Sequence, residues 1–256
     1  MMQEFLEFIN KNFDDYTRRA RLGPALLTVL PISLTVIGCF PNDYTVLAII
    51  TALGIANGGT ALLAQIGRNI GKRKEAELFQ SWGGKPTTQK LRHRNTSNKA
   101  ILERRHKKLQ LLIPDIHIPT LLEENSNPQE ADEIYELCTK FLIDQTRDVS
   151  RFNLIFEENC SYGFHRNLWG LKFIGIPLSL IGTLIITGFI IYSCSIGKTS
   201  ISPLTITSGV INFIFLLIWI FLITPDWVKP VAESYAERLL ESPEKLLVTN
   251  ATSQAP

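Results

Sequence analysis

Four stretches of this 256-residue chain are long, apolar and almost free of charge. Leu22–Phe40, Tyr44–Ile66 and Ile206–Ile223 contain no charged residue, and Leu171–Tyr192 contains only Lys172, near its edge. A helix needs about 20 mostly apolar residues to cross a bilayer core, and buried helices of soluble proteins rarely reach that length without a charge. An ordinary soluble domain and a disordered chain are therefore excluded, and an integral membrane protein is predicted.

The fold class predicted from these stretches is an all-α membrane protein. Four transmembrane helices form two hairpins, and a mainly helical cytoplasmic domain is inserted between spans two and three. The expected parts are an amphipathic helix, hairpin 1, a sensing domain, hairpin 2 and a cytoplasmic tail, at residues 1–21, 22–66, 67–170, 171–223 and 224–256. The N-terminal helix is typical of a segment that lies at a membrane surface, and packing on the central domain and self-assembly beneath a pore are the alternatives.

Basic residues predict the orientation of the spans. Lys and Arg flank the sides that face both termini and the central domain, whereas residues 41–43 carry none and residues 193–205 carry only Lys198. Because loops rich in Lys and Arg stay in the cytoplasm, both termini and the central domain are expected there. Lys172 is expected to reach toward the membrane interface.

Turn-forming residues predict where the helices outside the spans begin and end. We expect a helix that continues past the second span to about Gln80 and breaks at 81–86. Further along the chain the pattern predicts a helix at 97–112, a polar loop at 123–128, one long or kinked helix at 129–167, and a helix near 231–241 that Pro230 opens.

The small net charge of +2 conceals two opposed blocks. Residues 68–108 contain 13 Lys and Arg against three Asp and Glu, whereas residues 109–167 contain four against 11. The basic block is either a solvated face paired with the acidic block or a site for phosphate groups. The residues of this block assigned to a ligand site are Lys85, Arg92, Arg94, Arg104 and Arg105.

The segment 82–92 favours the phosphate site. Gly83 and Gly84 permit close approach of a backbone to a ligand, and the Thr87 and Thr88 hydroxyls can donate to an oxyanion. Trp82 can stack on a base. The spacing of a Walker A loop is absent. A structured turn in which Trp82 anchors a core is the alternative interpretation.

A second polar cluster, 157–167, precedes the third span. Tyr162 and Arg166 share a helix face, and His165 and Asn167 lie beside them. The cluster predicts either a ligand contact or a joint that packs the central domain against the span. Tyr162, His165, Arg166 and Asn167 complete the candidate ligand-binding set.

Residues typical of catalysis or of metal binding are not recognisable in the sequence. The four histidines have no nucleophile motif beside them, and neither CxxC nor HExxH occurs. We therefore expect no enzyme, no catalytic residue, no metal site and no cofactor. Within the spans, Asn57, Thr60 and Asn212 either pack helices together or line a pore between subunits, because one chain encloses no obvious channel.

Two motifs resemble a known group of proteins. Trp82-Gly83-Gly84-Lys85-Pro86-Thr87-Thr88…Leu91-Arg92 and Asn159…Tyr162-Gly163-Phe164-His165-Arg166-Asn167 are similar to motifs of four-span membrane effectors in bacterial anti-phage nucleotide-signalling systems. The Hailong-type membrane effector is the most similar, and CBASS transmembrane effectors are looser relatives. The resemblance implies a multi-pass protein of the bacterial inner (cell) membrane that responds to a nucleotide or oligonucleotide made by a partner nucleotidyltransferase.

The resulting hypothesis is an oligomeric ion channel or membrane-depolarising protein of abortive-infection defence. Its expected partners are copies of itself, with a tetramer as one candidate, the nucleotide messenger and the lipid bilayer. The alternative is a membrane-anchored scaffold or adaptor without a pore, in which the charge blocks serve a protein partner.

Overall fold

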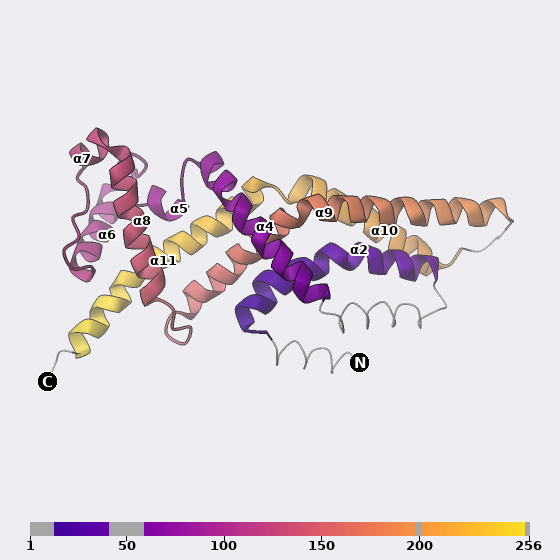
Figure 1. Cartoon of the computed structure of the whole chain (residues 1–256), viewed down its shortest axis with the longest axis horizontal. Helices are drawn as coiled ribbons and strands as arrows, with labels where there is room; N and C mark the ends of the chain where they lie inside the picture. Colours follow the sequence, from indigo (N-terminus) through magenta and orange to yellow (C-terminus); the bar gives the residue numbers. More distant parts are fainter. Residues whose placement is uncertain (1–12, 41–58, 198–200, 254–256) are drawn as a thin grey trace. The chain divides into compact units, whose positions relative to one another are not determined.

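The computed structural model describes residues 13–40, 59–197 and 201–253. All regular structure in these ranges is helical, and no strand occurs in them. The helices in chain order are η1 (Thr17–Leu22, π-helical), α2 (Gly23–Cys39), α4 (Gly59–Trp82), α5 (Pro86–Gln89), α6 (Lys99–Leu112), α7 (Leu121–Ser126), α8 (Pro128–Gln145), α9 (Asn153–Ser195), α10 (Pro203–Leu217), η2 (Ile218–Leu222, π-helical) and α11 (Pro225–Ser253). The all-α prediction is confirmed for this part of the chain (Figure 1).

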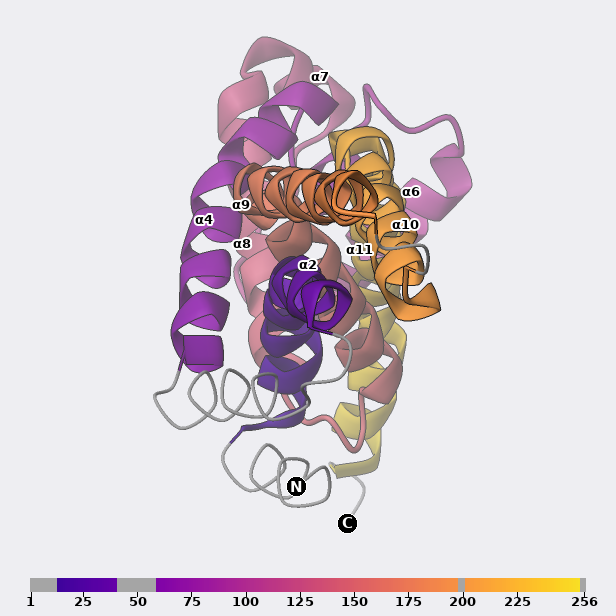
Figure 2. The same ribbon diagram turned by 90° about the vertical axis from the view of Figure 1, so that its right-hand side faces the viewer.

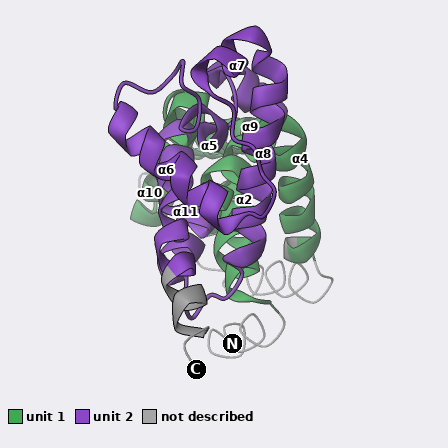
Figure 3. Ribbon diagram, turned by 90° about the vertical axis from the view of Figure 1, so that its left-hand side faces the viewer, with its two compact units in different colours: residues 1–75, 163–228 green, residues 76–162, 229–256 purple. Residues whose placement is uncertain are grey.

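The chain divides into two compact units (Figure 3). Unit 1 comprises residues 1–75 and 163–228, and unit 2 comprises 76–162 and 229–256. The part of α11 from Lys229 onward therefore belongs to the same unit as the central segment. The sequence, by contrast, predicts residues 224–256 as a separate cytoplasmic tail.

Unit 1 contains the apolar helical segments, except residues 153–162 of α9, which belong to unit 2. In the described ranges, three segments are long and apolar enough to cross a membrane: Thr17–Cys39, Asn153–Ser195 and Pro203–Leu222. They cover the predicted third span, and all but the last residue of the predicted first and fourth spans. Most of the predicted second span falls on residues 41–58, outside the described residues, so four spans and their two hairpins stay a prediction.

Helices α2, α9 and α10 of unit 1 lie side by side (Figures 1 and 2). Glycines permit the close approach: a Cβ at Gly38 of α2 would lie 3.1 Å from both Ile186 of α9 and Ser208 of α10. Trp219, Leu168 and Leu171 form a buried cluster in the same unit. Small residues at such contacts are typical of helices that associate in a membrane.

Local capping corrects two predictions about unit 2. The predicted loop at 123–128 is wrong, because Thr120 and Glu123 form a capping box that begins the helix α7. The predicted single helix at 129–167 is also wrong, because the chain turns between α8 and α9. The Asp148 carboxylate accepts hydrogen bonds from the backbone N–H and hydroxyl of Ser150, at 3.0 and 2.6 Å, and stabilises that turn.

Two further boundaries are set by glycine and proline. Helix α4 ends at Trp82, directly before Gly83 and Gly84, as predicted. Pro230 does not open the C-terminal helix, because α11 begins at Pro225 and contains Pro230. Pro225 suits the first position of the helix, because an N–H there has no helical acceptor, whereas Pro230 lies one turn further in and leaves the carbonyl of residue 226 without its helical donor.

The core of unit 2 joins helices that are distant in sequence. Leu91, Tyr135 and Cys138 are fully buried in it, and Leu239 of α11 is buried in the same cluster. Figure 3 shows α11 beside α6 and α8 within this unit. The segment after Pro114, between α6 and α7, is an irregular connection.

Candidate functional site

The glycine loop after α4 is closed by side chains of its own unit. Gly83 and Gly84 have positive φ angles of 82° and 130°. Arg92 donates from Nη1 to the Gly83 carbonyl at 2.7 Å, and Gln89 donates to the carbonyls of Trp82 and Gly84 at 2.9 and 2.7 Å. A Cβ at Gly84 would lie 2.7 Å from Arg92 Nη2. The close approach that the two glycines permit is thus used by the Arg92 guanidinium.

Arg92 and Arg94 converge on one carboxylate. Arg92 binds Asp132 with two hydrogen bonds of 2.7 Å, and Arg94 Nη2 lies 3.0 Å from both oxygens of Asp132. The Arg92 side chain is only 10% exposed. Paired hydrogen bonds between a guanidinium and a carboxylate are among the strongest in proteins. The structure therefore brings together two of the predicted ligand-binding cations, around an acidic group of α8.

Glu124 is a fully buried carboxylate with four donors. It accepts from the backbone N–H groups of His93 and Arg94, from the Arg94 guanidinium and from the Tyr135 hydroxyl, at 2.7 to 3.1 Å. Burial alone would raise the pKa of Glu124, but the hydrogen bonds from His93 and Tyr135 and the charge of Arg94 lower it below the usual value. Burial raises the pKa of Tyr135, and the bond to Glu124 raises it further.

The remaining predicted cations of the basic block are paired as well. Lys85 contacts Glu136 at 2.6 Å, and Arg104 contacts Glu244 at 2.8 Å. Arg105 forms an ion pair with Glu237. Thr87 and Thr88 are buried, and neither the Thr88 hydroxyl nor the Trp82 indole N–H has a hydrogen-bond partner among the described residues. Trp82 itself packs edge-on against Phe79, with ring centroids 6.0 Å apart.

A polar pocket lies beside the basic block. It has a volume of about 370 Å³ and is lined by Pro86, Gln89, Lys90, Asn95, Thr96, Ser97, Asn98, Ile101, Arg105, Glu233 and Glu237. Lys90 and Arg105 reach the two oxygens of the same carboxylate, Glu237, and the Lys90 contact is 2.8 Å. Helix α6 begins at this pocket, where Asn98 accepts a hydrogen bond from the backbone N–H of Ile101.

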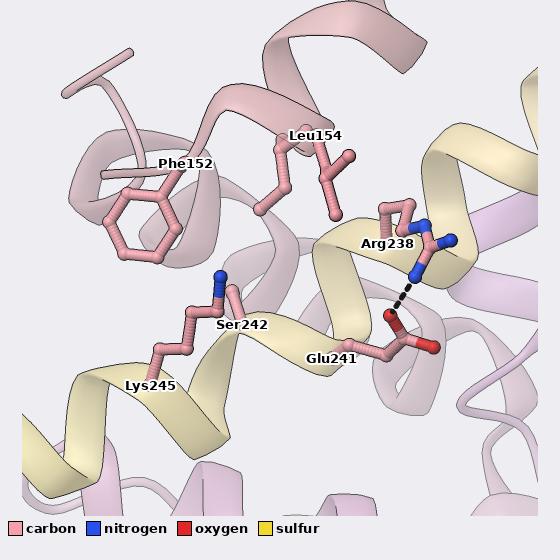
Figure 4. A pocket seen from close by; sticks show the side chains of 7 residues that line it. Phe152, Leu154, Arg238, Glu241, Ser242 and Lys245 are labelled. Carbon is pink, nitrogen blue, oxygen red and sulfur yellow. Dashed lines mark hydrogen bonds and ion pairs between the residues drawn. The ribbon is translucent and has the colours of Figure 1, made fainter. Parts of the chain in front are cut away.

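A second, smaller cavity of unit 2 lies between the start of α9 and α11. Its volume is about 120 Å³. Figure 4 shows Phe152 and Leu154 on one side and the side chains of α11 on the other, with Arg238 paired to Glu241 at 3.0 Å. This cavity contains none of the residues predicted to bind a ligand.

The second polar cluster is divided between the units. Tyr162 belongs to unit 2, where it is buried and stacks on Tyr235 with ring planes 4° apart. His165, Arg166 and Asn167 belong to unit 1. The His165 ring lies 4.1 Å from the Trp227 ring, centroid to centroid. These contacts are those of packing side chains, and ligand binding by the cluster stays a prediction.

Arg166 and Asn167 stand where α4 and α9 cross. Arg166 forms an ion pair of 2.8 Å with Glu75 of α4, and Asn167 donates to the Ala20 carbonyl in η1 at 2.8 Å. A Cβ at Gly170 would lie 2.8 Å from the backbone nitrogen of Gly71. The two helix backbones therefore touch at this crossing, and the polar side chains bind around it.

Of the three predicted pore residues, the structure describes the side chain of Asn212 alone. Asn57 lies outside the described residues, and so does the side chain of Thr60 in α4. Asn212 of α10 is fully buried within unit 1 and donates to the Thr35 hydroxyl at 3.0 Å. Its burial matches the packing alternative in this conformation.

The site residues that were not predicted from the sequence are mainly the acidic residues that pair with the basic block. Asp132 and Glu124 belong to the acidic block, so the block as a whole was visible. Glu237 and Glu244 lie in α11, more than 130 positions from their partners Arg105 and Lys108. Lys90 was recognised as part of the basic block but was not assigned to the site.

Metal-binding clusters and known relatives add no further assignment. In the described part of the chain, no group of three or more His, Cys, Asp or Glu is placed to hold a metal ion. Cys39 and Cys194 are unbonded thiols there. No protein-family model, no curated protein and no solved structure matches this chain.

Proposed function

We propose that this protein is an oligomeric membrane effector of anti-phage defence, an ion channel or membrane-depolarising protein that a nucleotide or oligonucleotide controls. The apolar helices of unit 1 support the membrane location, because their exposed faces are themselves apolar: Leu184, Ile191 and Phe221 are 62%, 64% and 73% exposed. Surfaces of this kind are stable in lipid and costly in water.

The polar pocket of unit 2 is the observation that carries ligand control. Lys90 and Arg105 come from different elements and hold the two oxygens of one carboxylate. A phosphate offers the same paired oxygens with more charge, so it can take the place of Glu237 between the two cations. The pocket volume of about 370 Å³ leaves room for more than a single phosphate group.

Exchange of Glu237 for a phosphate is also a means of control. A ligand shifts a conformational equilibrium only if it binds one state more tightly than the other. In the structure the Lys90–Glu237 and Arg105–Glu237 pairs connect the basic block to α11. A ligand that releases α11 from these two cations has the required preference for a state in which the pairs are broken.

Binding is tested with fluorescein-labelled short DNA and RNA oligonucleotides and with ATP, by fluorescence anisotropy on the full-length protein in detergent. The double variant Lys90→Gln/Arg105→Gln should weaken binding by tenfold or more, since a hydrogen bond to a charged group contributes about 1.5–3 kcal/mol. Lys107→Gln is the matched control, because Lys107 is exposed on the same helix, α6. Equal affinity for the double variant and the control would refute the site.

Conduction is tested with the full-length protein in liposomes. We expect ion flux whose size changes when the bound oligonucleotide is added or removed. A protein that conducts no ion in either state is not a channel.

The scaffold alternative is favoured by one observation. The predicted ligand-binding cations Lys85, Arg92, Arg94, Arg104 and Arg105 all form ion pairs within unit 2. Such pairs build a defined surface for a protein partner without any small ligand. A stable partner recovered by crosslinking in cells, together with no ion flux, would support this alternative.

A further inference from the structure

The helix α10 ends in a π-helical turn, η2, directly before α11. In this turn the N–H of Ile223 donates to the carbonyl of Ile218, five residues earlier, at 3.1 Å. Ile223 itself leaves the helix, with φ and ψ angles of −79° and 86°, and α11 begins two residues later at Pro225. We call residues 218–224 the α10–α11 joint. Because π-helical turns are rare and lie frequently at functional sites, this joint is a candidate for a part of unit 1 that changes conformation.

A lysine of the neighbouring helix α9 binds the open end of this turn. Lys172 donates from Nζ to the carbonyls of Ile220 and Ile223, at 3.0 and 2.9 Å. The last four carbonyls of a helix have no helical donor, and a cation at that end also interacts favourably with the helix dipole. Lys172 is the one charged residue of the apolar stretch 171–192, where a charge is costly unless it has such a role. One side chain therefore supplies two hydrogen bonds that the joint lacks.

Packing fixes the position of η2 against α9, one turn further along that helix. Gly175 shares a helix face with Lys172, and a Cβ at Gly175 would lie 2.3 Å from the ring of Trp219. Trp219 and Ile223 are 1% and 2% exposed. These contacts are closed and apolar, whereas the Lys172 side chain is half-buried and its hydrogen bonds can be exchanged for bonds to water. Lys172 is therefore the contact through which the joint can be held or released.

The chain connects this joint to the helix that carries part of the polar pocket of unit 2. Helix α11 begins at Pro225 in unit 1, and from Lys229 onward it belongs to unit 2. Glu237, the carboxylate that Lys90 and Arg105 bind in the pocket, is a residue of the same helix. A movement of α11 that follows the displacement of Glu237 is therefore passed along the chain to the α10–α11 joint.

We infer that Lys172 is a positioning residue that holds the α10–α11 joint in the ligand-free conformation, and that a ligand in the polar pocket favours a conformation in which its two hydrogen bonds are broken. The inference rests on the proposed function and adds its regulation. Once Lys172 is released, η2 can rewind from π-helical to α-helical, with each N–H donating to the carbonyl four residues before it. A change of register by one residue turns a helix by about 100° and shifts it by about 1.5 Å. A turn of that size changes which side chains α10 presents to the rest of unit 1.

The hold on the joint is tested by hydrogen–deuterium exchange of residues 218–228, measured by mass spectrometry on the full-length protein in lipid nanodiscs. Lys172→Met keeps the apolar length of the side chain but removes its donors, whereas Lys172→Arg keeps donors. Lys72→Met is the matched control, because Lys72 is an exposed lysine of α4 in unit 1. We expect exchange to become at least threefold faster in Lys172→Met, less so in Lys172→Arg, and to stay unchanged in Lys72→Met. Equal exchange in Lys172→Met and the wild type would overturn the inference.

The link to the ligand is tested by fluorescence anisotropy with the labelled oligonucleotides. Lys172→Met should bind at least threefold more tightly than the wild type, although Lys172 lies outside the pocket, because a weaker hold on the joint leaves a larger fraction of the protein competent to bind. A variant that is merely destabilised would bind more weakly. If the wild type binds and Lys172→Met binds equally or more weakly, the inference fails, although the proposed function stands. If the wild type binds no oligonucleotide, the proposed function and release by a ligand both fail, and the exchange experiment still decides whether Lys172 holds the joint.

Discussion

Two fully buried polar residues show how the two units differ. Glu124 in unit 2 carries a charge and receives four hydrogen bonds, whereas Asn212 in unit 1 is neutral and its Oδ1 receives none from the described residues. Around Glu124, unit 2 thus uses its polar groups to fix its own packing, although its Trp82 indole N–H and Thr88 hydroxyl have no partner among the described residues. Unit 1 retains polar groups that its own side chains do not satisfy, inside helices that are otherwise apolar. The first arrangement satisfies a buried charge completely, and the second leaves a buried polar atom unpaired.

The largest expected effect is a loss of stability on substitution of Glu124, the buried carboxylate that receives four hydrogen bonds. Glu124→Gln keeps the shape of the side chain but removes the charge that faces Arg94. Because breaking a buried ion pair leaves the other charge uncompensated, we expect unfolding of unit 2 to become easier by about 3–5 kcal/mol. Chemical denaturation followed by circular dichroism measures the change. Glu103→Gln, an exposed residue of α6, should stay within about 0.5 kcal/mol. Equal effects for both would mean that Glu124 is not an anchor.

A smaller effect is expected where α4 and α9 touch. At Gly170 a Cβ would meet backbone atoms of Gly71 at 2.8 and 2.9 Å, and backbone cannot rotate away as a side chain can. Gly170→Ala should therefore destabilise unit 1 by about 1–3 kcal/mol. At Gly188, in the same helix, nothing lies within 4 Å, so Gly188→Ala should stabilise it by up to about 1 kcal/mol through helix propensity. Thermal unfolding in detergent should give opposite signs for the two variants.

For Asn212, whose Oδ1 has no partner among the described residues, we expect substitution to change the stability very little. Asn212→Leu loses the hydrogen bond to Thr35, but it also removes the unpaired Oδ1. The Thr35 hydroxyl keeps the Pro31 carbonyl as its acceptor, at 2.7 Å. We therefore expect a stability change within about 1 kcal/mol of the wild type, since replacing an imperfectly paired polar group by an apolar one of similar shape is often neutral. A loss as large as that of Glu124→Gln would show that Asn212 is a structural anchor too.

The features of the fold that depend on local composition could be predicted from the sequence. The apolar stretches, free of charge, predicted the helices of unit 1, and Gly83 and Gly84 predicted the end of α4. The boundaries of α7, α8 and α9 were missed because they depend on side chains that cap a particular N–H, such as Thr120 and Asp148. A charge pattern over tens of residues does not contain that information.

The candidate site was harder to predict than the helices. The basic and acidic blocks were visible, and pairing between them was one of the two interpretations. The specific pairs were not visible, because Glu237 meets Lys90 and Arg105 only after α11 has folded onto the rest of unit 2. The surroundings of Asn212 were equally hidden: it was recognised as polar within a span, but its contacts with Thr35 and Gly182 depend on how α2, α9 and α10 pack.

The smallest expected effect concerns the capping box of α7, in unit 2. Hydrogen bonds from the Thr120 N–H and hydroxyl, and from His117, lower the pKa of Glu123 from 4.5 to about 2. Because this pKa is lower in the folded state, the capping carboxylate stabilises the fold fully above pH 4.5, and the stabilisation is lost as the pH falls to about 2. The melting temperatures of the wild type and Glu123→Gln should therefore differ at neutral pH and converge across that window. A difference that persists unchanged at pH 2 would mean that the Glu123 side chain stabilises the fold through packing and not through its charge.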